Sequence, residues 1–442
     1  METSGETLQG WGGTRAAGVE IRSEDLAAIT RGAVLTRGLG RSYGDSSLPP
    51  PGTHSLPGSA LADRILSFDT NSGALRAEAG LSIGEIQRLF LPRKWTFPVL
   101  PGTQYVTLGG AVAADIHGKN HHVDGTIGRH VGALLLRVAD DSVVRCSRQE
   151  NYDLFQATLG GMGLTGHILE VEVALKRIPS PWIWRESERI NGIDAFIEAL
   201  AQAARDWPYT VGWMDALAQG ASLGRGILIR GRWAEASEAP KDPPRPRPRL
   251  QVPFALPGWA LNSLSMRAFN TLYFHRHPKH PKRGIVHPES FFHPLDVVRR
   301  WNLIYGKRGF TQHQCVLPEK DRPGAAKRYL ESLTAGGLGS FLCVIKDCGP
   351  EGEGLLSFPR SGISIAVDLP IRARTQETVN ELNERVLEAG GRIYLAKDSL
   401  STPEHFRAME HRLEEFEIVR RRWDPERRLK SAQSVRLLGD SA

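Results

Sequence analysis

The stretch from Gly102 to His122 combines small residues with titratable side chains. It reads Gly102-Thr-Gln-Tyr-Val-Thr-Leu-Gly-Gly-Ala-Val-Ala-Ala-Asp-Ile-His-Gly-Lys-Asn-His-His122. Small residues let the backbone come close to a flat ring system or a diphosphate. His117 and Lys119 bring groups that titrate or carry charge to the same place. A packed core has no use for this combination, so the stretch predicts a pocket for an anionic aromatic cofactor.

A second glycine-rich segment, Arg37-Gly-Leu-Gly-Arg-Ser-Tyr-Gly-Asp45, follows an expected short strand at residues 34–36. Its glycines permit positive φ angles, which allow successive backbone N–H groups to face one anion. Arg37 and Arg41 add positive charge, and Ser42 adds a hydroxyl donor. No long amphipathic helix follows the loop, and it lacks the Gly-Lys-Ser/Thr ending of a Walker motif, so Rossmann and P-loop interpretations are disfavoured.

The two segments resemble the motifs of FAD-binding oxidoreductases of the vanillyl-alcohol-oxidase type. Within that group the chain is most similar to the decaprenylphosphoryl-β-D-ribose 2-oxidases, from Leu8-Gln-Gly-Trp-Gly-Gly13 to the arginine-rich segment 419–427. The resemblance implies an α+β fold. A PCMH-type FAD-binding domain would be joined to a substrate-binding domain with an antiparallel sheet flanked by helices.

The resemblance places FAD against both glycine-rich segments. The cofactor-binding residues that it implies are Arg37, Gly38, Gly40, Arg41, Ser42, Tyr43, Gly44, Gly102, Thr107, Gly109, Gly110, Ala114, His117, Ile168 and Tyr394. Relatives with covalent FAD often carry histidine where this chain has Arg41. Arginine cannot form the histidyl bond to the flavin 8-methyl group, so we expect non-covalent FAD, with Arg41 on the diphosphate and His117 near the isoalloxazine.

A third segment, Gly390-Gly-Arg-Ile-Tyr-Leu-Ala-Lys-Asp-Ser399, resembles the family strand that brings a tyrosine and a lysine to the flavin and substrate. Without the resemblance, Lys397 beside Asp398 is more often a surface ion pair. With it, Lys397 and His117 are the expected catalytic residues. The substrate-binding residues that the resemblance implies are Lys119, Trp213, Phe292, Gln312, Gln314, Lys346, Ala366 and Lys397.

For four of these residues, Gln312, Gln314, Ala366 and Phe292, the sequence gives a further expectation about the pocket. Gln312 and Gln314 are two residues apart on an expected strand, so their side chains would point together. Ala366 stands where many relatives carry a pocket cysteine, and Phe291-Phe292 stands where relatives carry a tyrosine-containing version. The covalent reactivity of that cysteine toward electrophiles should therefore be absent, and the polarity of the pocket should differ.

The resemblance implies oxidation of the ribose C2 hydroxyl of a polyprenylphosphoryl-ribose to the 2-keto sugar, with Lys397 accepting the hydroxyl proton. This is the first half of an epimerisation to arabinose for cell-wall arabinan. A separate NAD(P)H-dependent short-chain reductase would complete it, and a quinone or oxygen would reoxidise the flavin. Two alternatives stay open: a flavin oxidase of a soluble polyol or aldonolactone, or of another lipid-linked pentose, and a binding protein without turnover.

The 442-residue length predicts more than one domain. The turn-rich Ile178-Pro-Ser-Pro181 marks an expected boundary. We expect the FAD-binding domain at 1–180, the substrate domain at 181–391 and a C-terminal segment at 392–442 that returns to the first domain. Residues 234–252 are rich in Pro and Arg without apolar periodicity, which indicates a mobile loop.

The net charge of +7 is concentrated in arginine- and lysine-rich runs. Aromatic residues are not interleaved with these runs as a nucleic-acid platform requires, so we expect no nucleic acid, and a phosphate-bearing lipid substrate accounts for the same charge. The apolar stretch 253–274 precedes the basic run 275–283. This order fits docking to a membrane surface, but it favours a helix packed on the substrate domain, because apolar helix faces are usually core.

The four cysteines, Cys146, Cys315, Cys343 and Cys348, have no paired spacing, which predicts free thiols in a reducing compartment. No metal is expected, because the histidines at 117, 121 and 122 lack a carboxylate or thiolate partner at ligand spacing. The N-terminus shows no signal peptide, and no window reaches the roughly 18 apolar residues of a membrane span. These features predict a cytoplasmic protein, at the periphery of the inner membrane if the docking interpretation holds.

Overall fold

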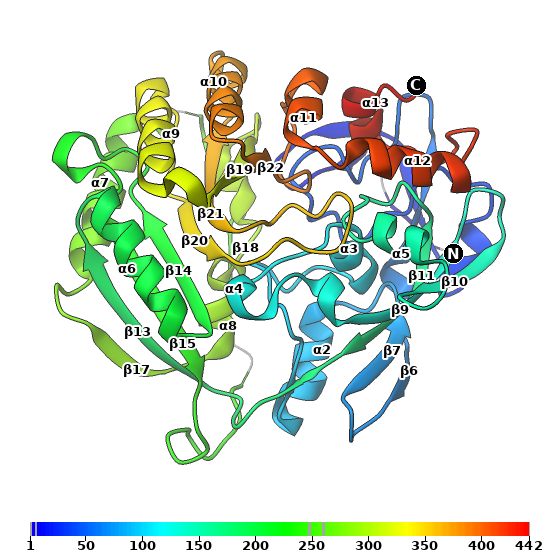
Figure 1. Cartoon of the computed structure of the whole chain (residues 1–442), viewed down its shortest axis with the longest axis horizontal. Helices are drawn as coiled ribbons and strands as arrows, with labels where there is room; N and C mark the ends of the chain where they lie inside the picture. Colours follow the sequence, from blue (N-terminus) through cyan, green and yellow to red (C-terminus); the bar gives the residue numbers. More distant parts are fainter. Residues whose placement is uncertain (1, 5–6, 246–248, 259–260, 442) are drawn as a thin grey trace.

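In a computed structural model, the chain folds into two units that are each built around β-sheet (Figure 1). The structure describes residues 2–4, 7–245, 249–258 and 261–441. A five-stranded sheet of order β10-β9-β11-β7-β6 and a three-stranded sheet of order β1-β4-β5 form the first unit. The second unit contains an eight-stranded sheet of order β17-β13-β15-β14-β20-β21-β19-β22. This architecture confirms the predicted α+β fold, in which the second unit has an antiparallel sheet flanked by helices.

The first unit is built mainly from the N-terminal part of the chain. Its elements are β1 (Glu2–Ser4), β2 (Thr7–Gln9), β3 (Arg15–Ala17), β4 (Val19–Arg22), α1 (Leu26–Ile29), β5 (Ser55–Gly58), β6 (Ile65–Phe68), β7 (Ala74–Glu78), α2 (Ile83–Phe90), β8 (Trp95–Thr96), α3 (Leu108–Ala113), α4 (His121–Asp124), β9 (Val131–Arg137), β10 (Val143–Ser147), α5 (Tyr152–Thr158), β11 (His167–Ala174) and β12 (Lys176–Arg177).

Local chemistry explains the elements that the sequence pattern predicts. Ser82 caps α2 by accepting a hydrogen bond from the Glu85 backbone N–H at 3.2 Å. Ile83, Ile86 and Phe90 recur at helical spacing and are buried. β9 and β10 pair antiparallel as a hairpin across Asp140 and Asp141. The predicted strand at residues 34–36 is wrong: the chain there is irregular, and only a single bridge joins Arg37 to Gly58.

The second unit begins with β13 at Ile183. Its elements are β13 (Ile183–Ile190), α6 (Ile193–Asp206), β14 (Tyr209–Met214), β15 (Gly226–Trp233), β16 (Leu250–Gln251), α7 (Ser263–Arg276), β17 (Lys282–Val286), α8 (Pro288–Phe292), β18 (Val298–Arg299), β19 (Phe310–Pro318), α9 (Arg322–Gly336), β20 (Cys343–Cys348), β21 (Gly362–Pro370), α10 (Thr375–Glu388) and β22 (Arg392–Ile393).

The eight-stranded sheet has two different faces because side chains alternate along each strand. On one face, Phe196 of α6, Tyr329 of α9 and Leu382 of α10 pack against apolar strand residues such as Ile345 and Ile365, and all five are buried. Figure 1 shows these helices covering the outer side of the sheet. The opposite face points to the first unit, and it carries the polar residues of the site.

The C-terminal segment returns to the first unit. After β22 the chain forms α11 (Pro403–Met409), α12 (Leu413–Trp423) and α13 (Ala432–Leu438), which Figure 1 shows above the first unit. Phe416 of α12 and Leu437 of α13 pack in one buried cluster with Tyr394 and Met162. The segment thereby places the residues after β22 at the junction of the two units.

The segment predicted as a mobile loop is partly paired. Leu250–Gln251 forms a parallel pair with Val298–Arg299, and Val252 N–H donates to the Arg299 carbonyl at 3.0 Å. Residues 246–248 of this segment and 259–260 of the apolar stretch lie outside the described residues.

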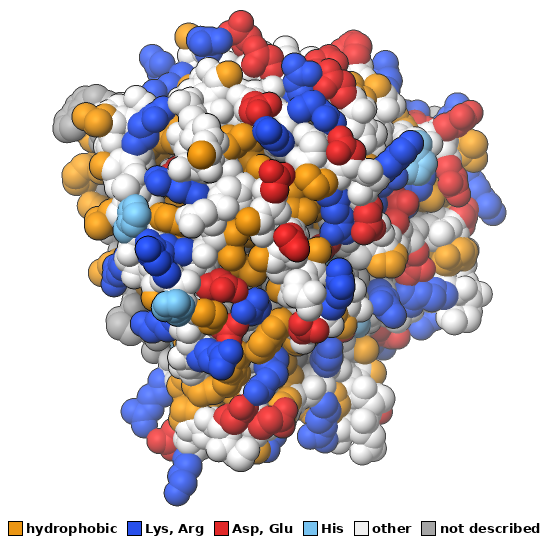
Figure 2. Space-filling model, turned by 60° about the vertical axis from the view of Figure 1, so that its left-hand side comes forward, with side chains coloured by type: hydrophobic (Ala, Val, Ile, Leu, Met, Phe, Trp, Pro, Cys, Tyr) orange, Lys and Arg blue, Asp and Glu red, His pale blue; other side chains and the backbone are white. Residues whose placement is uncertain are grey.

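The surface around α6, α7 and α9 mixes basic, acidic and hydrophobic side chains (Figure 2). Among the described residues, no helix is long and apolar enough to cross a bilayer.

Candidate active site

A cavity of about 850 Å³ lies between the two units. The first unit lines it with both glycine-rich segments, and the second unit lines it with the inner face of its sheet. The lining includes most of the predicted site residues: Gly38, Gly40, Arg41, Ser42, Tyr43, Gly102, Thr107, Gly110, Ala114, His117, Lys119, Trp213, Gln312, Gln314, Lys346, Ala366, Tyr394 and Lys397. The structure therefore brings together residues that are up to 359 positions apart in the chain, from Gly38 to Lys397.

The first glycine-rich loop offers unused backbone donors to the cavity. The N–H groups of Leu39, Gly40, Arg41 and Ser42 donate to no acceptor among the described residues. Gly40 has a φ of +63°, a conformation that glycine adopts without strain. Consecutive N–H groups in such a turn form a concave anion site of the kind that binds a diphosphate.

The second glycine-rich segment lies directly against the first. A Cβ atom on Gly38 would lie 2.6 Å from Thr107 Oγ1, so only glycine fits there. Thr107 caps α3 and accepts a hydrogen bond from the Gly110 N–H at 3.1 Å. Gly102 has no atom within 4 Å of its Cβ position, so it leaves open space at the cavity wall. Together the two segments form a cradle for a long, flat, anionic ligand.

Arg41 contributes a cation beside aromatic rings. Its guanidinium lies 4.3 Å from the ring centroid of Trp11 and 5.2 Å from that of Tyr105. Its Nε is buried and has no hydrogen-bond partner in the described part of the chain. Burial lowers its pKa, an effect that the carboxylate of Asp296 opposes. A half-buried guanidinium at the cavity wall, whose Nε has no hydrogen-bond partner in the described part of the chain, is a site for an anionic group of a ligand.

At the other end of the cavity, His117 is held between two residues of the sheet. Lys346 Nζ contacts His117 Nδ1, and the side-chain amide of Gln314 lies 3.1 Å from His117 Nε2. Burial, followed by the charge of Lys346, lowers the pKa of His117 well below its usual value, so the ring is neutral at pH 7. An ammonium has only donors, so Nδ1 of the neutral ring accepts from Lys346, and the ring proton lies on Nε2.

Lys397 lies in the same region, with its Nζ 3.7 Å from the ring centroid of Tyr43. A tight turn places it there, because its backbone N–H donates to the Tyr394 carbonyl at 2.9 Å. Burial lowers the pKa of Lys397 to about 7, although the carboxylate of Asp368 opposes this shift. An amine that is about half neutral at pH 7 can accept a proton from a bound hydroxyl group.

Similarity to a known protein over nearly the whole chain identifies the family. The chain is 35% identical over 444 aligned residues to the decaprenylphosphoryl-beta-D-ribose oxidase of Mycolicibacterium smegmatis, and the alignment covers 96% of this chain and 95% of that protein. The chain belongs to the decaprenylphosphoryl-β-D-ribose oxidase family. Residues 24–147 of this member also match the family model of an FAD binding domain, so the protein is an FAD-dependent oxidoreductase.

Two further similarities agree with this family. An uncharacterised Streptomyces coelicolor protein is 31% identical over 78% of this chain and 96% of its own length. A structure of a variant of Physcomitrella patens BBE-like 1 matches with a TM-score of 0.69 at 13% identity, covering 95% of this chain and 91% of that one. The second similarity shows a shared fold.

In this member of the decaprenylphosphoryl-ribose oxidase family, the cavity fits FAD. The free N–H groups of the first loop and Arg41 suit the diphosphate, and the Gly102–Gly110 segment leaves room for a ring system. When bound, the flavin supplies the hydride acceptor that no side chain can provide.

Five predicted site residues do not line the cavity. The guanidinium of Arg37 donates to the Gln9 carbonyl at 2.7 Å and lies 3.4 Å from Glu20, so it holds the loop in place instead of contacting a ligand. A Cβ on Gly44 would lie 2.0 Å from the Asp398 carbonyl oxygen, so Gly44 serves a close backbone approach. Phe292 is buried, and its neighbour Phe291 lines the cavity.

The remaining two of the five lie behind the cavity wall. Gly109 packs against Ala79, whose carbonyl accepts the Gly109 N–H at 2.8 Å. Ile168 is a buried core residue of β11. Both residues match the family motif in sequence. In the structure they contact neighbouring backbone and core residues, so they do not face the cavity.

Asp368 is a site residue that the motifs did not predict. It is fully buried beside the cavity, where it accepts hydrogen bonds from Gln312 Nε2 at 2.6 Å and from the Tyr305 hydroxyl at 2.9 Å. Burial raises its pKa to about 7. Strand alternation could have found it, since Asp368 is two residues after Ala366 on β21 and must share the inner face.

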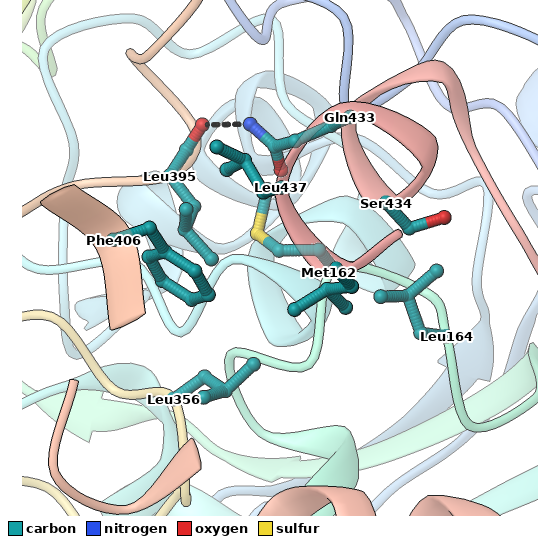
Figure 3. Close-up of a pocket in the computed structure, with 9 residues that line it drawn as sticks. Met162, Leu164, Leu356, Leu395, Phe406, Gln433, Ser434 and Leu437 are labelled. Carbon is teal, nitrogen blue, oxygen red and sulfur yellow. Dashed lines mark hydrogen bonds between the residues drawn. The ribbon is translucent and has the colours of Figure 1, made fainter. Parts of the chain in front are cut away.

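A second, very small cavity beneath α13 is apolar (Figure 3). Met162, Leu356 and Leu437 point toward one another there, and the Gln433 amide is used by the Leu395 carbonyl at 2.9 Å. It carries no charged group among its lining residues, so it belongs to the packing of the C-terminal segment.

Proposed function

We propose that this protein oxidises the ribose C2 hydroxyl of a polyprenylphosphoryl-ribose to the 2-keto sugar, the first half of an epimerisation to arabinose. The observation that carries the proposal is the convergence of Lys397, His117 and Gln314 at one end of a cavity that fits FAD. The near full-length similarity to a decaprenylphosphoryl-ribose oxidase supports this choice of substrate.

The proposed role of each residue follows from the chemistry of its side chain. Lys397, as a neutral amine, accepts the proton of the C2 hydroxyl. Gln312 and Gln314 hydrogen-bond neighbouring sugar hydroxyls from one face of β19. Lys346 holds the neutral His117 ring in a fixed orientation beside the reacting carbon.

The aromatic and apolar walls serve a different purpose. Trp213 and Tyr394 form buried surfaces of the cavity and exclude water from the reacting sugar. Lys119 donates to the Phe292 carbonyl at 2.9 Å, and burial lowers its pKa to about 7. We assign to Lys119 a contact with the phosphate side of the substrate.

The cofactor and partners follow from the same proposal. FAD is held non-covalently, because Arg41 stands where a covalent histidine would be. The 2-keto product requires a separate NAD(P)H-dependent reductase that delivers hydride to the carbonyl carbon. A quinone or oxygen reoxidises the flavin, and the protein works in the cytoplasm at the periphery of the inner membrane.

Anaerobic bleaching of the flavin absorbance on adding a short-chain prenylphosphoryl-ribose tests this proposal. Rapid bleaching is expected in the wild type and in the control Lys320→Ala, which changes an exposed lysine. Lys397→Ala should bind flavin but bleach at least about a hundredfold more slowly, because general-base catalysis is lost. A protein that bleaches only with a free polyol or aldonolactone would belong to the soluble-substrate alternative, and a protein that takes up no FAD would refute the proposal.

A further inference from the structure

Arg185 is a half-buried basic residue that lines the large cavity. It lies on β13, the second strand from one edge of the eight-stranded sheet (Figure 1). Its Nε is buried without a hydrogen-bond partner, and its guanidinium forms no ion pair with any described residue. A buried donor that stays unpaired destabilises the fold, and an anionic group of a ligand would satisfy it.

The acidic residue next to Arg185 in the sequence does not neutralise it. Side chains alternate along a strand, so Glu186 lies on the opposite face of the sheet, where its carboxylate accepts a hydrogen bond from Arg230 Nε at 2.6 Å. Asp296 is the one acidic residue among the described residues of the cavity lining, and Arg41 lies near its carboxylate. The cavity therefore presents the guanidinium of Arg185 to a ligand without a competing carboxylate.

Two glycines keep the sheet surface beside Arg185 clear. The backbone register pairs Arg185 with Gly231 on β15 and with Gly284 on β17. No atom lies within 4 Å of the Cβ position of Gly284. A Cβ on Gly231 would lie 2.9 Å from the Phe291 ring, so glycine lets this ring lie close to the sheet. The surface around Arg185 is therefore open on one side and bounded by an aromatic ring on the other.

A second basic residue, Lys119, lies beside the same aromatic ring. Its Nζ is 5.9 Å from the Phe291 ring centroid and donates to the Phe292 carbonyl at 2.9 Å. A protonated lysine has three donors, so two of them remain for a ligand in the cavity. Lys119 and Arg185 thus offer donors near one ring, an arrangement that suits the several acceptor oxygens of a phosphate group.

Two hydroxyl groups lie in the same part of the cavity. Ser187 follows Arg185 by two residues on β13, so it faces the same side of the sheet, and it is buried. Tyr273 of α7 also lines the cavity. Burial raises the pKa of Tyr273, and the charge of Arg185 opposes this rise, so the phenol keeps its proton close to the guanidinium. Neither hydroxyl bonds to another residue within the described ranges, so both can donate to an anion.

The sheet register connects these donors to the reacting end of the cavity. Lys346 lies in the same row as Ser187, across β13, β15, β14 and β20. Three strand spacings of about 4.8 Å separate the two backbones by about 14 Å. Arg185 and Lys346 both line the cavity, and Lys346 contacts His117. A phosphoryl-pentose fits this gap with its phosphate toward Arg185 and its ring toward His117.

We propose that Arg185, with Ser187, Tyr273 and Lys119, forms an anion subsite that binds the phosphate of the lipid-linked sugar. This rests on the proposed function, because the phosphate belongs to the substrate assigned there. The subsite holds the phosphate at one end of the cavity, so that the sugar extends toward the flavin. Arg185 is a binding residue and takes no part in proton or hydride transfer.

Farnesyl phosphate tests the subsite without turnover, because it has the phosphate and a prenyl chain but no sugar to oxidise. Quenching of tryptophan fluorescence measures its binding to the flavin-loaded full chain, since Trp213 lines the cavity. Arg185→Gln should weaken this binding at least about tenfold, because charge-assisted hydrogen bonds are lost, and should change farnesol binding by less than about twofold. Arg185→Lys should recover part of the affinity. Arg189→Gln is the matched control, because Arg189 lies on the same strand but does not line the cavity, and it should bind both ligands like the wild type.

Three results would overturn the subsite. An equal loss of farnesyl phosphate and farnesol in Arg185→Gln would show a packing defect instead of phosphate recognition. An equal loss in Arg185→Gln and Arg189→Gln would show a general effect of charge. Unchanged affinity in Arg185→Gln together with a loss in Lys119→Gln would assign the phosphate to Lys119 alone.

Flavin bleaching with short-chain prenylphosphoryl-ribose separates this inference from the proposed function. In Arg185→Gln the substrate concentration that gives half the limiting rate should rise at least about tenfold, while the limiting rate stays within about threefold, because uniform binding is lost. Bleaching with the same concentration dependence in the wild type and Arg185→Gln refutes the subsite alone. Binding of farnesyl phosphate that depends on Arg185, without bleaching by the substrate, refutes the proposed function and leaves the anion subsite standing.

Discussion

Burial controls the protonation of the three lysines around the cavity. It lowers the pKa of Lys119 and of Lys397 to about 7 and that of Lys346 to about 8. The physical cause is the same in each case, since an ammonium group that loses its hydration becomes less stable than the neutral amine. The site can therefore supply a neutral amine near physiological pH, which an exposed lysine could not.

This predicts a pH-dependent rate of flavin reduction. The neutral form of Lys397 increases as pH rises through about 7, so the rate with short-chain substrate should rise between pH 6 and 8 and then level off. Single-turnover absorbance traces at each pH measure it. Lys119→Gln should keep the same midpoint, and a rate that stays constant over this range would exclude Lys397 as the base.

Asp368 provides a second prediction about Lys397. Its carboxylate raises the pKa of that lysine, and it fixes Gln312 through a 2.6 Å hydrogen bond. Asp368→Asn removes the charge and retains an acceptor for Gln312. The midpoint of the pH–rate profile should move down by about one unit or less, while the plateau rate stays within about threefold. A lost plateau with an unmoved midpoint would indicate a purely structural role.

Among the elements, α13 connects the first glycine-rich loop to the segment of Lys397, the proposed catalytic base. Arg436 of α13 bonds Asp45 through two nitrogens at 2.8 Å each, and it bonds Asp398 at 2.9 Å. Asp45 ends the first glycine-rich loop, and Asp398 follows Lys397. One side chain near the C-terminus thus joins two segments that are about 350 positions apart in the chain.

Arg436→Met should therefore weaken both segments. It leaves two mostly buried carboxylates without a cation, a change that costs about 3 kcal/mol of unfolding free energy. Urea unfolding would measure the loss, and fluorescence titration should show weaker FAD binding. Arg422→Met removes an exposed ion pair with Asp153 and should cost less than about 1 kcal/mol. Equal losses in the two variants would contradict the linking role.

Local features of these elements can be predicted from the sequence, whereas contacts between distant segments cannot. Periodicity predicts α2 and β11 because the burial pattern of each is local. The position of Gln314 on the inner sheet face follows from strand alternation. The bond from Arg436 to Asp45 joins residues 391 positions apart, and no local pattern encodes such a contact. Phe292 was expected to line the cavity, but Phe291 lines it and Phe292 is buried behind it, because only the packing around α8 decides which ring reaches the cavity.

At the scale of the whole molecule, the cavity lies at the interface of the two units, and residues of both units line it. The first unit supplies the glycine cradle, and the second supplies the inner sheet face with its lysines and amides. Burying three lysines at this interface lowers the unfolding free energy at pH 7, because a lysine is more stable as a hydrated ammonium group in water. The hydrophobic burial in the two large core clusters offsets this loss of stability.

This cost predicts that stability increases in mild alkali. The unfolded chain keeps Lys119, Lys346 and Lys397 protonated up to about pH 10.4, whereas the folded chain releases these protons above about pH 7–8. The unfolded state thus binds more protons in this window, so the unfolding free energy rises with pH, by about 3–5 kcal/mol from pH 7.5 to 9. The four buried cysteines, whose pKa values are raised, oppose the rise from about pH 8 upward, because unfolded thiols ionise at about pH 8.5 while the buried thiols keep their protons, so they offset part of the lysine contribution within this window.

Urea midpoints of the flavin-loaded protein, followed by tryptophan fluorescence, would measure this rise. Lys119→Met removes one of the three lysines without introducing a new charge, so it should be more stable than the wild type at pH 7.5 and should lose about a third of the rise. A wild-type midpoint that falls between pH 7.5 and 9 would mean that the three lysines stay charged in the folded protein. In that case Lys397 could not act as a neutral base, and the chemistry proposed for the site would fail together with the stability argument.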